Sequence, residues 1–417
     1  MVRDQETSDD RSGTPATAAA FEYPSVRSTG AATLAHRRRA QRAAGEAAFE
    51  LGTLGGTGSG ASAINNRGWA MGSANLAGDT TAHAALWIYG KTHDLGTLGG
   101  PNSAVPWPSI KNNHGVIVGV SDTADDNPLH EVWSCALAFF PSASGKNCRG
   151  FVWKEGKMRA LPTLGGYNGV ATGVNNRGQI VGWAETMVHD STCIAPQVLQ
   201  FEAVIYGPEK DQIQALPPLA EDQDSAATAI NDKGQVVGIS GQCANAVGGL
   251  SAHHAVLWEN GVPTDIGNFG GIAWNTPTAI NSRGDVVGFS DFPGDSAAIR
   301  NYHAFLWTKN GGMKDLGTLP GDKRSIAWGI NNKGQIVGQS SGGPNGSRAV
   351  LWKNGVPVDL NSLVPSGPLT LTYANDVDDA GQIVGGASNA ATGISPGFVA
   401  IPAPGLDDDA HGGGPEY

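Results

Sequence analysis

The sequence predicts an all-β protein, a seven-bladed β-propeller with four antiparallel strands in each blade. Three short motifs recur in a fixed order about every 50 residues, and glycine accounts for 60 of the 417 residues. Repeats of about 40–50 residues, each with four short strands, are typical of propeller blades. A high glycine content fits a fold with many turns and fits a helical protein poorly. We therefore expect one repeat array instead of the several domains that the length alone suggests.

The first motif, Ile-Asn-Asn-Arg/Lys-Gly-Gln-Ile-Val-Gly, predicts the two inner strands of each blade. Asn and Gly tolerate a positive φ, so the middle of the motif predicts a tight turn. In the sixth copy the two strands are expected at residues 326–330 and 335–339. The glycine of this turn recurs in every copy, as Gly68, Gly115, Gly178, Gly234, Gly284, Gly334 and Gly381.

The other two motifs predict the outer strands. Ala-Phe/Val-Leu-Trp is rich in residues that favour strands and predicts the third strand, expected at 348–352 in the sixth copy. Asp-Leu-Gly-Thr-Leu-Gly-Gly marks the fourth strand, expected at 356–360. A tryptophan that recurs at one position is expected to do the same core packing in each blade. These tryptophans are Trp87, Trp153, Trp258, Trp307 and Trp352.

The order of the motifs at the two ends predicts how the ring closes. A copy of the third motif, with a strand expected at residues 50–54, precedes the first blade, and the last repeat stops after its third strand near Ile401. Because an unpaired edge strand invites aggregation, we expect the N-terminal strand to complete the last blade. The propeller is then expected to span residues 48–402, between disordered segments at 1–47 and 403–417.

The motifs resemble the repeat of bacterial proteins described as the probable extracellular repeat, HAF family. The matching segments are His254–Trp258 and His303–Trp307, together with the Asp-Leu-Gly-Thr-Leu-Gly-Gly and Ile-Asn-Asn-Lys-Gly-Gln-Ile-Val-Gly copies. The resemblance covers residues 50–401, which is most of the chain. It implies a propeller-like protein that is secreted or held at the cell surface, and it brings no catalytic motif.

Charge and composition argue against several classes of partner. A net charge of −11 disfavours contact with phosphate backbones, so no nucleic-acid binding is expected. No stretch approaches about 18 uninterrupted apolar residues, so we expect no membrane span, and we expect a monomer. The basic cluster Arg37–Arg39 is not followed by an apolar segment. No secretory signal is therefore visible, and a cytoplasmic location stays open beside the extracellular one.

No cofactor and no metal site are expected. The glycine-rich segment Gly55–Gly60 is not followed by Gly-Lys-Ser/Thr, so it is not a P-loop. The acidic runs at 122–126 and 407–409 lack the spacing of a calcium loop.

Loop lengths predict which face of the propeller carries function. The turns between strands one and two, and between strands three and four, are short and share one face. The links between strands two and three, and between blades, lie on the other face. They vary from 10 residues between Gly338 and Ala349 to 30 between Gly119 and Gly150. Since function tends to sit on variable loops of a rigid scaffold, we place any site on this face, near blades two to four.

The four cysteines lie in the long insertions. Cys135 and Cys148 share one insertion, and Cys193 and Cys243 follow the second strand of adjacent blades. Two disulfides are therefore expected, with four reduced thiols as the alternative.

Two groups of side chains on the variable face are candidate site residues. Aromatic residues that break the repeat pattern are candidates for stacking on a ligand, with local packing as the alternative. They are Trp107, Tyr167, Trp274 and Trp328. Acid/base residues in the insertions are candidates for catalysis or metal binding, with solvated loop residues as the alternative. They are His130, Glu131, His189, Asp190 and His253.

The leading hypothesis is a non-catalytic recognition scaffold that binds a carbohydrate, a small molecule or a protein on the variable face. The alternative is a propeller enzyme, a lyase, hydrolase or cyclase, that uses acid/base residues from the insertions of blades two to four. A third hypothesis is a structural surface protein without a small ligand. Propellers host binding and catalysis alike, so the fold alone does not decide.

Overall fold

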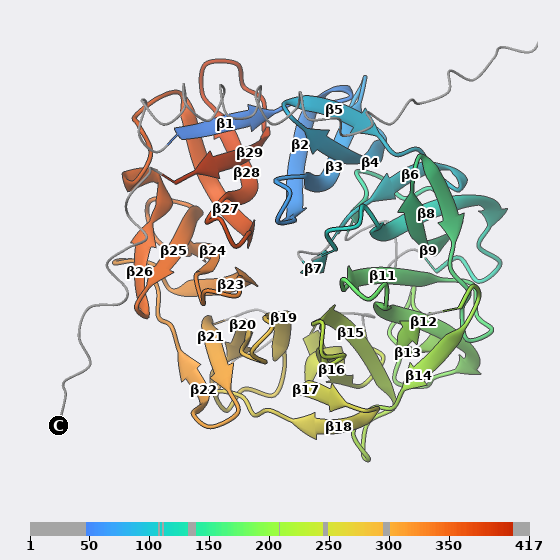
Figure 1. Ribbon diagram of the computed structural model, residues 1–417. Coiled ribbons are helices and arrows are strands. Elements are labelled where there is room, and N and C mark those ends of the chain that lie inside the picture. The colour runs from blue at the N-terminus through green and yellow to red at the C-terminus, as the bar shows by residue number, and fades with distance from the viewer. Residues whose placement is uncertain are drawn as a thin grey trace, which may run out of the picture.

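Seven β-sheets stand around a central axis in the computed structural model of the chain, as Figure 1 shows. The structure describes residues 47–106, 109–110, 112–131, 139–207, 209–244, 249–294 and 301–402. Six sheets have four strands, and the third blade carries a fifth. The prediction of an all-β, seven-bladed propeller is confirmed.

The first three blades hold the strands of residues 55–216. Blade one contains β2 (Gly55–Ile64), β3 (Ala70–Leu76), β4 (Ala82–Ile88) and β5 (Lys91–Asp94). Blade two contains β6 (Gly99–Ala104), β8 (Ile117–Asp126), β9 (Lys146–Lys154) and β10 (Lys157–Ala160). Blade three contains β11 (Gly169–Val174), β12 (Ile180–His189), β13 (Leu199–Tyr206) and β14 (Ile213–Leu216), with β7 (Ser109–Ile110) added parallel to β11.

The last four blades follow the same order. Blade four contains β15 (Asp224–Ile230), β16 (Val236–Gly241), β17 (His254–Glu259) and β18 (Val262–Asp265). Blade five contains β19 (Thr276–Ile280), β20 (Val286–Asp291), β21 (Tyr302–Thr308) and β22 (Gly312–Asp315). Blade six contains β23 (Arg324–Ile330), β24 (Ile336–Ser341), β25 (Arg348–Lys353) and β26 (Val356–Asp359). Blade seven contains β27 (Leu369–Val377), β28 (Ile383–Asn389), β29 (Gly397–Ile401) and β1 (Ala47–Leu51). Short 3₁₀ turns lie at η2 (Gly249–Ala252) and η3 (Leu360–Ser362).

The N-terminal strand β1 forms the outer edge of the seventh blade, as predicted. It pairs antiparallel with β29 along its whole length. Nδ2 of Asn389 also donates a hydrogen bond to Oε1 of Glu50. The strand covers Ala47–Leu51 and not the expected 50–54. In blades seven and one, the fourth strand ends within the first two residues of the third motif. The Gly-Thr-Leu of that motif then forms the link to the first strand of the next blade.

One glycine of each repeat is required by close contact between the two inner strands. A β-carbon on Gly338 would lie 1.9 Å from the carbonyl oxygen of Ile326, which no real contact permits. The same clash, at 1.9–2.1 Å from a backbone oxygen, arises at the corresponding glycine of every second strand. These glycines are Gly72, Gly119, Gly182, Gly238, Gly288, Gly338 and Gly385. The last glycine of the first motif is therefore needed for strand packing, whereas the earlier one serves the turn.

The recurrent tryptophans pack between neighbouring blades. Nε1 of Trp352 donates to the carbonyl oxygen of Leu316 in the preceding link, at 2.9 Å. Trp87 and Trp258 make the equivalent bond and are buried. Trp153 and Trp307 are half-buried against the same kind of core. The predicted packing role is confirmed.

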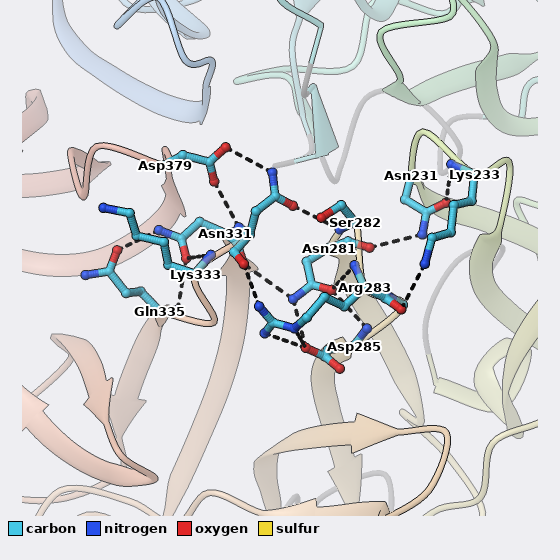
Figure 2. Close-up of polar contacts among 12 residues, drawn as sticks. Asn231, Lys233, Asn281, Ser282, Arg283, Asp285, Asn331, Lys333, Gln335 and Asp379 are labelled. Atoms are coloured by element: carbon cyan, nitrogen blue, oxygen red, sulfur yellow. Dashed lines mark hydrogen bonds and ion pairs between the residues drawn. The ribbon is translucent and has the colours of Figure 1, made fainter. Parts of the chain in front are cut away.

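Asparagines of the inner turns link the blades at the face that carries these turns, here called the turn face. In Figure 2, Nδ2 of Asn231 donates to the carbonyl oxygen of Asn281 at 3.0 Å, and Asn281 donates in the same way to Asn331. Six turns share this bond. Their donors are Asn65, Asn112, Asn175, Asn231, Asn281 and Asn331.

At the seventh turn Asp378 has no side-chain N–H to donate. The ring is closed there by bonds between the second residues of the turns, which also join Asn332 to Asp379. The backbone N–H of Asp379 donates to Oδ1 of Asn66 at 3.0 Å, and Nδ2 of Asn66 donates to Oδ2 of Asp379 at 2.7 Å. The backbone N–H of Ile64 also donates to Oδ2 of Asp376 at 2.9 Å. Carboxylates therefore join the last blade to the first.

Candidate functional site

A small cavity lies at the mouth of the central channel on the turn face. It has a volume of about 50 Å³, and second residues of the turns, such as Asn332 and Asp379, form part of its wall. Asn332 donates its Nδ2 to Asp379 at 2.9 Å, and its Oδ1 accepts the N–H of Ser282 at 2.9 Å. A space of this size holds only a few water molecules. Because its polar atoms bond largely to one another, we attribute the cavity to ring closure.

The opposite face carries the long insertions of blades two, three and four. We call its described part the loop platform, which consists of residues 127–131, 186–198, 242–244, 249–253 and 270–275. These segments come from insertions and from the link between blades four and five. Every acid/base candidate, and Trp274 among the aromatic candidates, lies on this platform.

A disulfide joins the insertions of blades three and four. Cys193 and Cys243 are bonded, with their Cα atoms 4.6 Å apart, so this predicted pair is confirmed. The backbone N–H of Ile194 donates to the oxygen of Ala244 at 2.9 Å beside it. Cys148 is also disulfide-bonded, whereas Cys135, its predicted partner, lies outside the described residues.

Backbone hydrogen bonds extend the platform to the link before blade five. The N–H of Trp274 donates to the oxygen of Gly249 at 3.1 Å, and the N–H of Asn275 donates to the oxygen of Ala252 at 3.0 Å. Trp274 adopts a φ of +57°, and His130 on the other side of the platform one of +56°. Bulky residues rarely adopt this conformation, and such strain persists where surrounding contacts hold it.

Buried carboxylates join the insertion of blade two to blade three. Glu131 is 1% exposed, and its Oε1 accepts the N–H groups of Val198 at 2.9 Å and Leu199 at 2.8 Å. Nε2 of Gln197 lies between Glu131, at 3.5 Å, and Glu185, at 3.1 Å. One carboxylate therefore positions three residues of the neighbouring insertion.

Asn168 makes the second bridge between the two carboxylates. Its Nδ2 donates to Oε1 of Glu185 at 3.0 Å and lies 3.5 Å from Oε2 of Glu131. Its backbone N–H donates to Oε2 of Glu185 at 2.8 Å. Burial, then repulsion from Glu131, raises the pKa of Glu185 to about 7. Burial also raises the pKa of Glu131. Two buried carboxylates that share donors favour a state in which one holds a proton.

A second carboxyl pair lies under the insertion of blade three. Asp224 is fully buried, and its Oδ1 accepts the N–H of Phe201 at 2.9 Å. Its Oδ2 has no hydrogen-bond donor. Burial, with a contribution from Asp190, raises the pKa of Asp224 to about 8. Asp190 itself accepts bonds from the N–H and hydroxyl of Thr192, both at 2.7 Å. A proton on Asp224 therefore lies beside the Asp190 carboxylate.

We expect stability to fall as the pH rises from 6 to 8. The raised pKa of Asp224 means that the folded protein holds a proton that the unfolded chain loses above its ordinary pKa of 3.8. The stabilisation is thus complete below that value and is lost as the pH approaches about 8. Asp224→Asn can keep the hydrogen bond from the N–H of Phe201 but cannot ionise. The free energy of unfolding, measured by urea titration, should fall by about 2 kcal/mol less between these pH values in the variant than in the original protein. Equal pH slopes in the two proteins would contradict the assignment.

Exposed apolar side chains gather on the platform. Five of the nine large hydrophobic side chains that are exposed in the described residues lie there, and Ile272 at 73% and Met187 at 59% are prominent among them. The other three are Val188, Ile194 and Leu250. Single exposed apolar residues need no explanation, but a group of them on one face marks an interaction surface.

The structure does not join the acid/base candidates into one constellation. Within the described residues, no hydrogen bond or ion pair connects any two of His130, Glu131, His189 and His253. His130 and His189 are exposed, and burial lowers the pKa of half-buried His253. Glu131 is buried and accepts hydrogen bonds from Val198 and Leu199, so it holds two insertions together.

The aromatic candidates occupy different places. Trp274 belongs to the platform, and half-buried Tyr167 lies on the link between blades two and three. Trp328 lies at the bulge of β23, with its ring 6.2 Å from that of Phe289 in blade five. Trp107 lies outside the described residues.

Sequence reasoning misses several residues that shape this face. Asn168, Glu185, Gln197 and Asp224 were not candidates, and none belongs to a recognised motif. The nearest signal is an acidic residue three positions after the strand glycine in blades two, three and five: Asp122, Glu185 and Asp291, all buried.

The histidines that recur at the start of third strands also have a defined partner. Nδ1 of His254 lies 2.9 Å from Oδ2 of Asp265 on the adjacent fourth strand. His83 and His303 form the same contact with Asp94 and Asp315. The repetition in three blades indicates a structural clamp between outer strands.

Comparisons with known proteins identify no family for this chain. No protein-family profile matches the sequence, and no curated protein is similar to it, so the HAF resemblance gains no support. Among solved structures, Pyrococcus horikoshii acylaminoacyl peptidase has a TM-score of 0.47 at 11% identity, over 84% of this chain and 52% of that one. A triple arginine-to-alanine mutant of AofleA from Arthrobotrys oligospora has a TM-score of 0.32 at 12% identity, over 75% and 88% of the two chains. The chain thus spans about half the length of the peptidase.

No helix among the described residues is long and apolar enough to cross a membrane.

Proposed function

We propose that this protein is a non-catalytic recognition scaffold that binds a protein partner on the loop platform. The observation that carries the proposal is the group of exposed apolar side chains on loops that are cross-linked to one another. Met187 and Ile272 project from different blades and are both more than half exposed. Methionine and aromatic residues, here Met187 and Trp274, are enriched where proteins bind each other.

The apolar groups favour a protein over a small ligand or a carbohydrate. Small-molecule sites are concave and surround their ligand with apolar walls. Ile272, Met187 and Val188 are instead each more than half exposed. Side chains that project in this way can enter pockets on a partner.

Cross-links reduce the entropic cost of binding through such loops. The Cys193–Cys243 disulfide and the bonds of Glu131 to Val198 and Leu199 hold three insertions in place before any partner arrives. A preorganised surface loses less freedom on association, and more of its contact energy appears as affinity. The disulfides also support a secreted or surface location, since such bonds persist in oxidising compartments.

The enzyme hypothesis has weaker support. One of its candidates, Glu131, is buried and accepts hydrogen bonds from a neighbouring loop. Another, Asp190, accepts hydrogen bonds from Thr192. Among the described residues, no hydrogen bond or ion pair joins either carboxyl to a histidine. We therefore assign the buried acids to the support of the binding surface.

The proposal is tested by substituting platform residues. The tagged full chain is used to isolate a partner from cells and culture medium of the source organism, and the purified partner is then titrated. Met187→Asp with Ile272→Asp should weaken binding at least about tenfold, because charge replaces apolar contact at the interface centre.

Val356→Asp is the matched control, since Val356 is 61% exposed on β26, away from the platform. It should leave the affinity unchanged. A partner, glycan or small ligand that binds the platform variant as tightly as the original protein would place the site elsewhere and contradict the proposal.

A further inference from the structure

We infer that the loop platform recognises a cationic partner: a protein segment whose lysine or arginine side chains flank apolar ones. This inference rests on the proposed function and adds the chemistry of the partner. It is drawn from the distribution of charge around the exposed apolar residues.

Basic residues are scarce on the platform and around it. No Lys or Arg occurs at 121–131, 186–198, 242–244 and 249–253 or in the links 217–223 and 267–275, and the end of the blade-two insertion carries two, Lys146 and Arg149. The same segments hold seven acidic residues: Asp122, Asp125, Asp126, Glu131, Asp190, Glu221 and Asp222. Acidic residues therefore outnumber basic residues around the apolar side chains.

Some of these acids are free to meet a partner. Asp125 and Glu221 are exposed and form no ion pair with any residue that the structure describes, although the half-buried Arg149 attracts Asp125. Asp126, 85% exposed, has Lys146 at 2.7 Å as its partner. Asp122 and Glu131 are buried, so they act on a partner only through the long-range field.

Basic residues are instead displayed on the turn face. The third residue of the inner turn is Arg67, Arg177, Lys233, Arg283 or Lys333 in five blades, and all five are exposed. In Figure 2, Lys233, Arg283 and Lys333 lie on these turns. The two faces thus differ in charge, and the field draws a cationic chain to the platform and not to the turn face.

The apolar residues set the second requirement. Ile272, Met187 and Ile194 can make apolar contacts with a partner, and a chain with charged side chains alone cannot form them. A segment that alternates cationic and apolar side chains satisfies both features. Charge governs encounter, and apolar contact governs retention.

Synthetic peptides of defined composition test the inference on the full chain. Three labelled peptides of equal length are titrated by fluorescence anisotropy: one of Leu and Lys, one of Leu and Glu, and one of Ser and Lys. The Leu/Lys peptide should bind at least about tenfold more tightly than either of the others. Its affinity should fall several-fold between about 20 mM and 150 mM salt, because screening shortens the reach of the acidic field.

Two pairs of variants separate charge from apolar contact. Asp125→Asn with Glu221→Gln should reduce the affinity about threefold at low salt and flatten its salt dependence, whereas Glu209→Gln on the turn face should not. Ile272→Ser should weaken binding at both salt concentrations, and Val356→Ser should not.

The outcomes distinguish failure of the inference from failure of the proposed function. If the Leu/Glu peptide binds as well as the Leu/Lys peptide and Ile272→Ser weakens both, the platform binds partners but the cationic class is wrong. If the Ser/Lys peptide binds equally well, apolar contact is not required and the inference also fails. If the Leu/Lys peptide does not bind, or if no platform substitution changes its affinity, the inference is overturned. The proposed function is contradicted only if the isolated partner also binds the Met187→Asp, Ile272→Asp variant as tightly as the original protein.

Discussion

Removing residues 1–52 is expected to unfold the ring, although only one short strand of the propeller is lost. Strand β1 supplies the whole outer edge of blade seven through its pairing with β29. Backbone hydrogen bonds contribute about 1 kcal/mol net each, and burial of Leu51, which is 6% exposed, contributes about 2 kcal/mol more. The total is several kcal/mol, a large part of a typical folding free energy of about 5–15 kcal/mol.

The truncation also removes Gly52, whose carbonyl oxygen accepts the Nε1–H of Trp87 at 2.9 Å. The damage therefore reaches blade one as well as blade seven. Thermal melting followed by circular dichroism should show a midpoint at least about 10 °C lower, or no cooperative transition.

Removing residues 1–46 is the matched control, because it leaves β1 intact. This shorter truncation should melt close to the full chain. If both truncations melt like the full chain, the seventh blade does not depend on β1, and closure of the ring must have another cause.

Gly338→Ala is expected to cost about 3 kcal/mol or more, which is a large effect for one methyl group. The added β-carbon would lie 1.9 Å from the carbonyl oxygen of Ile326 and 2.9 Å from its carbonyl carbon. Both atoms belong to the backbone of β23, so no side-chain rotation relieves the clash. Strands β23 and β24 must separate, and overpacking of this kind is strongly destabilising.

Gly367→Ala provides the comparison at a site with free space. A β-carbon on Gly367 meets nothing within 4 Å, and its φ is not in the left-handed region. Its urea midpoint should equal or slightly exceed that of the original protein, because alanine lowers the entropy of the unfolded chain. Similar midpoints for Gly338→Ala and Gly367→Ala would show that the inner strands tolerate side chains at this position.

The ring and its closure are predictable from the sequence because both depend on local, repeated signals. Each Asn-x-x-Gly turn joins strands that are neighbours in the chain, and the early copy of the third motif has no other blade to complete. The error in β1, placed at 50–54 and found at Ala47–Leu51, arises because the most recognisable part of that motif is the link and not the strand.

The interior of the loop platform is not predictable in the same way. Glu131 is a candidate from the sequence, but its partners Asn168, Glu185 and Gln197 come from three segments that meet only when blades two and three are packed together. Insertions have no counterpart in other blades, so no repetition reveals their contacts. Cys193 and Cys243 are the exception, since they follow equivalent strands of adjacent blades.

The asparagine bonds at the turn face give the ring a direction. Each of the six asparagines donates a side-chain bond to the next turn along the chain, whereas Asp378 accepts this bond from Asn331 and has no side-chain amide with which to pass it on. A unit with the turn of blade five can pass the asparagine bond to a copy of itself, whereas the turn of blade seven joins the next blade through Asp379 and Asn66 instead. Growth of such an array by tandem duplication is therefore expected to copy interior units, and the carboxylate turn marks where the circle ends.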